Sequence, residues 1–122
     1  MAAATLDLLP GTLDLLVLRA LRWEPTHGAG VADWIRVVTG GVFRVEEGTL
    51  YPALHRMERA GLIASEWGRS DANRKARFYN LTQDGRARLK ALLDAWSRYS
   101  GAVDAAVRHG YPRALWAEGA AR

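Results

Sequence analysis

The sequence predicts a mainly α-helical fold that carries one small β-hairpin and ends in a long helix. Three observations predict it. Apolar residues recur at helical spacing in three segments before residue 61. Two short segments rich in β-forming residues then flank a polar loop between residues 62 and 81. Beyond them, apolar residues repeat in steps of four and three over residues 89–107, which is the spacing of a heptad stripe.

The composition indicates a folded globular protein. Of the 122 residues, 49% are hydrophobic and 25% are charged, and there is no Cys. These values exclude a mainly disordered chain, a disulfide scaffold and a thiolate metal site. The apolar stretch Leu6–Leu21 is interrupted by Asp7, Pro10 and Asp14, and it falls short of the ~20 apolar residues that a bilayer span needs. We therefore expect no membrane anchor, and the absence of Cys suits a reducing cytoplasm.

Basic residues are concentrated in one segment. The whole chain has a formal net charge of +4, with 17 Lys and Arg against 13 Asp and Glu. Between Arg69 and Lys90, however, there are seven basic residues and two acidic ones, so the net positive charge of this segment exceeds that of the whole chain. Such a concentrated charge favours a polyanionic partner, whereas the simpler interpretation is a solvated basic surface.

The first half of the chain predicts three helices. The first spans Pro10–Trp23 and is apolar on most sides, which a second subunit would explain by covering Leu13 and Leu16. After a turn at residues 24–28, the second helix spans about residues 29–38, and residues 42–45 are expected to be extended.

The third helix spans about residues 47–60 and ends at Gly61. Pro52 leaves its start open: the helix begins near Thr49, or Pro52 kinks it. A hairpin follows, with strands at residues 62–67 and 77–81 and a polar loop at residues 68–76.

The last helix is expected over about residues 83–108, with Thr82 as its N-cap. Its apolar stripe predicts an interface with a second copy, and the alternative is a helix folded back on its own domain. Counting the first helix, the predicted dimer interface is Leu13, Leu16, Leu89, Leu93, Trp96, Val103 and Val107. Within the stripe, Trp96, Tyr99 and Ser100 form a candidate site for a flat aromatic effector, unless Trp96 is simply core packing.

Three helices followed by a hairpin describe a winged helix-turn-helix, and the long last helix would serve for dimerisation. We divide the chain into a DNA-binding domain at residues 8–81, a dimerisation helix at 82–109 and a tail at 110–122. In this fold the third helix enters the major groove. At 100° per residue, Leu50, Leu54 and Met57 face the core. The outward face offers Thr49, Pro52, His55 and Arg56, and the basic residues placed to reach DNA from the hairpin are Arg69, Arg74, Lys75 and Arg77.

Several motifs resemble the PadR family of bacterial transcriptional regulators. The strongest is residues 47–63, EGTLYPALHRMERAGLI, which is similar to the recognition-helix signature of the family. The leucine-rich stretch 13–21, the Glu66-Trp67 pair and the stretch 74–85 also match. The turn at residues 27–30 departs from the family, because it lacks the Gly-Tyr pair often found there.

The resemblance implies a cytoplasmic bacterial homodimer, associated with the nucleoid when bound to DNA, that represses transcription at a pseudo-palindromic operator. Many members release DNA when a small hydrophobic or aromatic compound binds. Carried over to this chain, the DNA-reading block includes Thr49, Tyr51, Pro52 and Arg56, and the wing includes Arg74, Lys75 and Arg77. The single last helix resembles the short subgroup of the family.

Catalytic motifs are absent from the sequence. The three His residues have no metal-ligand spacing, and there is no nucleophile motif or phosphate-binding Gly loop. We therefore expect no enzyme, no cofactor and no metal. The remaining alternative is a dimeric winged-helix module that binds protein and not DNA.

Overall fold

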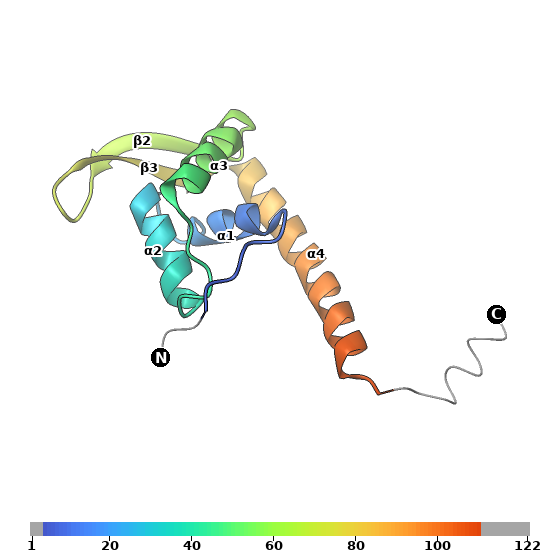
Figure 1. Cartoon of the computed structure of the whole chain (residues 1–122). Coiled ribbons are helices and arrows are strands. Elements are labelled where there is room, and N and C mark those ends of the chain that lie inside the picture. The colour runs from blue at the N-terminus through green and yellow to red at the C-terminus, as the bar shows by residue number, and fades with distance from the viewer. Residues whose placement is uncertain (1–3, 111–122) are drawn as a thin grey trace. The chain divides into compact units, whose positions relative to one another are not determined.

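Residues 4–110 are described by a computed structural model, which divides the chain after Leu92 into two units, and each is treated separately below. The order of elements is the one expected for a winged helix-turn-helix followed by a long helix, which confirms the predicted fold class (Figure 1). The elements are α1 (Thr12–Ala20), β1 (Thr26–His27), α2 (Gly28–Val38), α3 (Glu47–Arg59), β2 (Ile63–Arg69), β3 (Lys75–Leu81) and α4 (Gln83–Arg108).

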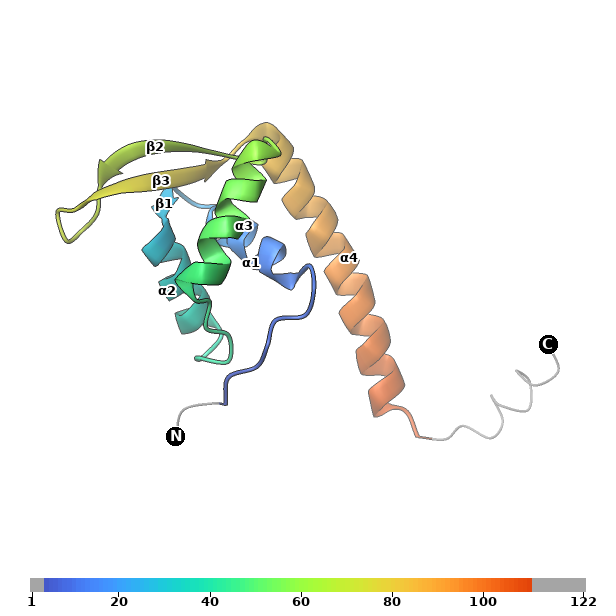
Figure 2. The ribbon, with the colours of Figure 1, turned by 45° about the horizontal axis from the view of Figure 1, so that its top comes forward.

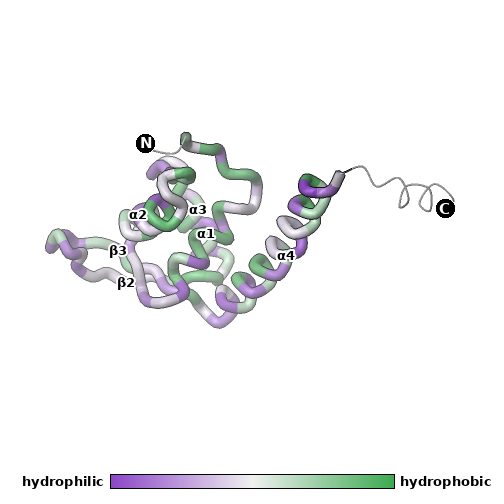
Figure 3. The backbone as a smooth tube through the Cα atoms, turned by 90° about the horizontal axis from the view of Figure 1, so that it is seen from below, coloured by the Kyte–Doolittle hydropathy of each residue, from purple (hydrophilic) through white to green (hydrophobic). Residues whose placement is uncertain are grey.

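Apolar side chains from the first three helices form the core of the first unit. The largest fully buried ones are Val17, Leu18, Leu21, Val31, Ile35, Leu50, Leu54, Met57 and Ile63. Figure 3 shows α1 as hydrophobic along most of its length. The inward face predicted for the third helix is confirmed, because Leu50, Leu54 and Met57 are all buried. Truncating such a side chain to Ala costs about 2–5 kcal/mol, so this core fixes the orientation of α3.

Helix α1 is shorter than predicted. It begins at Thr12 and ends at Ala20, whereas the sequence favoured Pro10–Trp23. Gly11 precedes it with φ +85°, so the chain turns at Pro10 and Gly11 before the helix begins. At the other end the Leu21 amide donates to the carbonyls of both Val17 and Leu18, a tightened last turn that ends the helix.

The sheet has three strands, where the sequence predicted two. Thr26 and His27, expected in a turn, pair antiparallel with Tyr79 and Phe78 of β3, so the strand order is β1-β3-β2. A strand of two residues is too short to show the alternating pattern from which strands are predicted. Residues 42–45, expected to be extended, form no strand, and the Val42 carbonyl accepts a hydrogen bond from the Leu6 amide at 2.8 Å.

The hairpin is longer and its loop shorter than predicted. Strands β2 and β3 remain in register from Ile63↔Leu81 out to Arg69↔Lys75, which leaves only residues 70–74 in the loop. Asn73 closes the turn with φ +57°, a conformation that Asn tolerates. The polar residues at the ends of the strands were assigned to the loop, but strand pairing depends on backbone hydrogen bonds and tolerates polar side chains on an exposed hairpin. Figure 2 shows the hairpin extending away from α3 as a wing.

Helix α3 begins at Glu47 and not at Thr49, so Pro52 lies inside the helix. Gly61 ends it with φ +77°, as predicted. The next junction is also as predicted: the Thr82 hydroxyl accepts from the Gly85 amide at 3.0 Å and caps α4. The same hydroxyl donates to the Gly61 carbonyl at 2.6 Å, and the Thr82 amide donates to the Leu62 carbonyl at 3.1 Å. Hydrogen bonds of Thr82 therefore join the two ends of the hairpin to the start of α4.

Helix α4 runs unbroken to Arg108, and its stripe changes character along its length. Leu89 is buried within the first unit. In the second unit Trp96, Val103 and Val107 are exposed, and Val107 is 76% exposed. The Trp96 and Tyr99 rings stack at 6.2 Å between centroids. The predicted tail beyond Gly110 lies outside the described residues.

Candidate nucleic-acid interface

The outward face of α3 is exposed as its sequence spacing predicts. Thr49, Pro52, His55 and Arg56 are all exposed on it, and Tyr51, which the family resemblance added, is exposed as well. Their positions follow from the burial of the opposite face, because residues that alternate with core positions around a helix must face outward. This face presents hydroxyl, imidazole and guanidinium groups, which suit contacts to base edges or to phosphates.

Arg56 is tied to the first helix. Its guanidinium donates two hydrogen bonds to the Asp14 carboxylate on α1, Nη1 to Oδ2 at 2.9 Å and Nη2 to Oδ1 at 2.6 Å. These bonds raise the pKa of Arg56 above its ordinary value, so the group is always charged. The side chain is 55% exposed, and a guanidinium has five N–H donors, so some remain for DNA.

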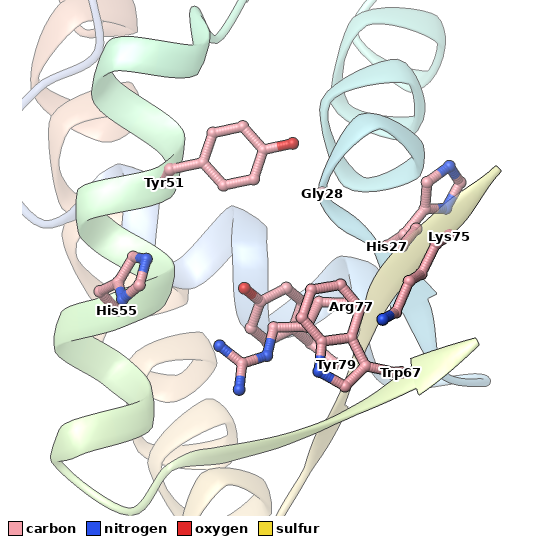
Figure 4. A pocket seen from close by; sticks show the side chains of 9 residues that line it. His27, Gly28, Tyr51, His55, Trp67, Lys75, Arg77 and Tyr79 are labelled. Carbon is pink, nitrogen blue, oxygen red and sulfur yellow. The ribbon is translucent and has the colours of Figure 1, made fainter. Parts of the chain in front are cut away.

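Tyr51 is positioned by a glycine of the second helix. A Cβ at Gly28 would lie 2.8 Å from Tyr51 Cε1 and 2.9 Å from its hydroxyl oxygen, closer than real Cβ contacts. The Tyr51 ring therefore lies directly against the backbone at the start of α2. Figure 4 shows its hydroxyl pointing from α3 toward Gly28.

On the wing, an exposed tryptophan lies between two cations. Lys75 Nζ is 4.8 Å and Arg77 Cζ is 5.3 Å from the centroid of the Trp67 ring. The register explains this cluster, since Trp67 pairs directly with Arg77 and Lys75 is two residues away on the same face of β3. Trp67 is nevertheless 60% exposed.

A groove of about 340 Å³ separates α3 from this face of the wing (Figure 4). None of its lining residues is acidic, and Lys75 and Arg77 supply two permanent positive charges, which makes the groove attractive to an anion. In Figure 4 the Arg77 guanidinium points from the wing toward α3. The lining residues are His27, Gly28, Tyr51, His55, Trp67, Lys75, Ala76, Arg77 and Tyr79.

Tyr79 forms the buried floor of the groove and is 3% exposed. Burial raises the pKa of its hydroxyl above the ordinary value and the charge of Glu58 acts in the same direction, whereas the charge of Arg77 opposes this shift. The neighbouring Ser65, which pairs with Tyr79 across the sheet, donates a hydrogen bond to the Glu58 carboxylate on α3. This bond joins α3 to the base of the wing.

The structure brings together only part of the predicted site. Tyr51, His55, Lys75 and Arg77 line one groove. Arg69 and Arg74 lie at the far end of the hairpin, where Arg69 donates to the Asn73 carbonyl. Lys75 and Arg69, expected in the loop, are paired strand residues. Sequence reasoning gave no role to His27, Gly28 or Trp67. Of these, Trp67 carried a signal, because it alternates with Ile63 on the face of the first predicted strand.

The sequence of the chain matches the Transcriptional regulator PadR-like family over residues 17–91, more than half its length. The chain belongs to this family. It is therefore a DNA-binding transcriptional regulator and not an enzyme, and the resemblance inferred from its motifs is confirmed.

Individual relatives agree with this assignment. A transcriptional regulator of Mycobacterium tuberculosis is 51% identical over 47 residues, which are 38% of this chain and 43% of that protein. A PadR family regulator of Eggerthella lenta has a crystal structure that is 30% identical, with a TM-score of 0.69 over 82% of this chain and 85% of that one. The crystal structure of a PadR family regulator from Clostridium difficile is 28% identical, with a TM-score of 0.68 over 80% of this chain and 99% of that one.

The part of the chain that the structure describes contains neither a metal-binding cluster nor a membrane-spanning helix. No three His, Asp or Glu side chains of residues 4–110 gather closely enough to hold a metal ion. No helix within those residues is long and apolar enough to cross a bilayer.

Proposed function

We propose that this PadR-like regulator acts as a homodimer that represses transcription from a pseudo-palindromic operator. The observation that supports it best is the groove between α3 and the wing, where recognition-helix side chains and wing cations share one acid-free surface. A recognition helix reads base edges in the major groove, while wing cations neutralise phosphates. Thr49, Pro52, His55 and Arg56 would supply the first kind of contact, and Arg69, Arg74, Lys75 and Arg77 the second.

Exposed apolar residues support the homodimer. Leu13 and Leu16 on α1 are only partly covered by their own chain. Trp96, Val103 and Val107 on α4 are exposed. A second copy that covered these residues together with Leu93 would remove apolar area from water at roughly 25 cal/mol per Å². We accordingly assign residues 8–81 to DNA binding and residues 82–109 to dimerisation.

The stacked pair Trp96 and Tyr99 supports an effector site on α4. Both rings are exposed, and Ser100 beside them is only partly covered. We propose that a flat aromatic compound stacks there and releases the DNA. Titration with naphthalene derivatives should change Trp fluorescence in the parent protein. A Trp96→Phe variant that binds and responds like the parent would remove Trp96 from this role.

Selection from genomic DNA tests the central proposal. The purified protein is mixed with genomic fragments at physiological salt with excess random competitor, because phosphate contacts imitate specificity at low salt. We expect enrichment of a sequence with two-fold symmetry. A folded dimer that enriches no sequence would contradict sequence-specific binding and favour a protein-interaction module.

A further inference from the structure

Trp67 is an exposed aromatic residue on the proposed DNA-binding face. It is 60% exposed although Lys75 and Arg77 lie against its ring. A large apolar ring left in water is unfavourable, and exposed Trp is enriched where partners bind.

The position of the ring follows from the strand pairing. Ile63, Ser65 and Trp67 lie on one face of β2, opposite Leu81, Tyr79 and Arg77 of β3. At the base of the wing this face is buried, as Ile63 and Leu81 show. Farther out the same face opens into the groove, where Trp67 lines one side and Tyr51 and His55 of α3 line the other.

In the proposed binding mode, one strand of DNA would pass through this groove. A helix in the major groove and a wing beside it lie on either side of a sugar–phosphate backbone, because that backbone separates the two grooves of the duplex. Lys75 and Arg77 suit its phosphates. The deoxyriboses between the phosphates are apolar on their C–H faces, and of the groove's wing residues Trp67 has the largest apolar surface.

We propose that Trp67 packs against a deoxyribose of the DNA backbone and gives the wing an apolar contact beside its two charged ones. The inference rests on the proposed function, since it needs DNA on this face. The proposal separates the salt-dependent part of the binding free energy from the salt-independent part. Contacts by Lys75 and Arg77 weaken as salt rises, whereas the contact by Trp67 does not.

The chain contains a matched control. Trp23 is 67% exposed, and Arg19 and Arg22 lie at 5.2 and 5.0 Å from its ring centroid. It therefore has the same chemistry as Trp67, but it does not line the groove. If any exposed, cation-flanked Trp assisted DNA binding, the two residues would behave alike.

The test is fluorescence anisotropy of a labelled DNA duplex, titrated with full-length protein between about 50 and 200 mM salt. Trp67→Leu should weaken binding about tenfold at every salt concentration and leave the slope of log K against log salt unchanged. Trp67→Phe should lose less, and Trp23→Leu should bind like the parent. Circular dichroism melts of all variants establish that they are folded, which the exposure of both rings leads us to expect.

Three outcomes would overturn the inference. Equal binding by the parent and Trp67→Leu would show that the ring makes no contact. A Trp67→Leu variant with a shallower salt slope would show that the ring acts only by holding Lys75 and Arg77. If the parent bound no DNA, both the proposed function and this inference would fail. That outcome differs from the other two because the parent and every variant would then show no binding.

Discussion

The guanidinium of Arg56 and the carboxylate of Asp14 form a two-point ion pair that joins the recognition helix α3 to α1. The residues are 42 positions apart in the sequence. Arg56 was predicted to contact DNA, and here it also fixes the helix that carries that contact. Because the pair is partly exposed, its contribution to stability is about 0–1 kcal/mol.

Removing the acid should therefore change DNA binding more than stability. In Asp14→Asn the Arg56 guanidinium loses its anionic partner, and a negative charge near the DNA-binding face disappears. We expect two- to fivefold tighter non-specific binding and a salt slope steeper by about one contact. Salt titration measures both quantities. Asp33→Asn is the control, because Asp33 pairs with Arg36 on α2; an unchanged slope in Asp14→Asn would mean that Arg56 does not reach phosphate.

The contact between Gly28 and Tyr51 predicts a long-range effect of a single methyl group. Gly28→Ala would place its Cβ 2.8 Å from Tyr51 Cε1, so the ring must move from its position on α3. We expect only a small loss of stability, because the clashing atoms are the far end of the exposed Tyr51 side chain, and severalfold weaker DNA binding. Binding and thermal melts check this. Gly101→Ala, with nothing within 4 Å of the added methyl, should leave DNA affinity unchanged. Full affinity in Gly28→Ala would show that the ring position of Tyr51 is irrelevant.

Lys75 should act on DNA through its charge. Lys75→Ala is expected to weaken binding to all sequences alike and to reduce the salt slope by about one phosphate contact. Titrations on two unrelated duplexes test both parts. Lys90→Ala, an exposed cation on α4, serves as the control. A slope equal to that of the parent would remove Lys75 from the interface.

Charges introduced into the stripe of α4 should prevent dimerisation. Leu93→Asp combined with Val103→Asp would bury two carboxylates in an apolar interface, which costs several kcal/mol. We expect monomeric or unfolded protein in analytical ultracentrifugation. The control is Arg98→Asp, on the face opposite the stripe. A folded dimer of the double variant would contradict the proposed interface.

The features that sequence predicts well here are local ones. Leu50, Leu54 and Met57 reveal the inner face of α3 because helical spacing alone determines it. Gly61 and Thr82 mark helix ends because their roles depend on one residue's backbone or hydroxyl. The order of elements and the basic hairpin already indicated DNA binding, and the family motifs strengthened that role.

The features that it misses depend on partners distant in the chain. Strand β1 exists only because β3 offers it hydrogen bonds. The pair of Arg56 with Asp14 and the contact of Tyr51 with Gly28 each require two helices to be placed first. The groove likewise combines residues from α2, α3 and both wing strands, so it becomes visible only after the sheet register is known.

The hydrogen bonds around Thr82 have a mechanical consequence. Gly61 and Leu62 at the base of the wing are held to Thr82, and a Cβ at Gly85 would collide with the Leu62 carbonyl. The first turn of α4 is therefore packed directly against the base of the hairpin. We therefore expect a tilt of that turn to move the hairpin with it, including the paired residues Trp67 and Arg77.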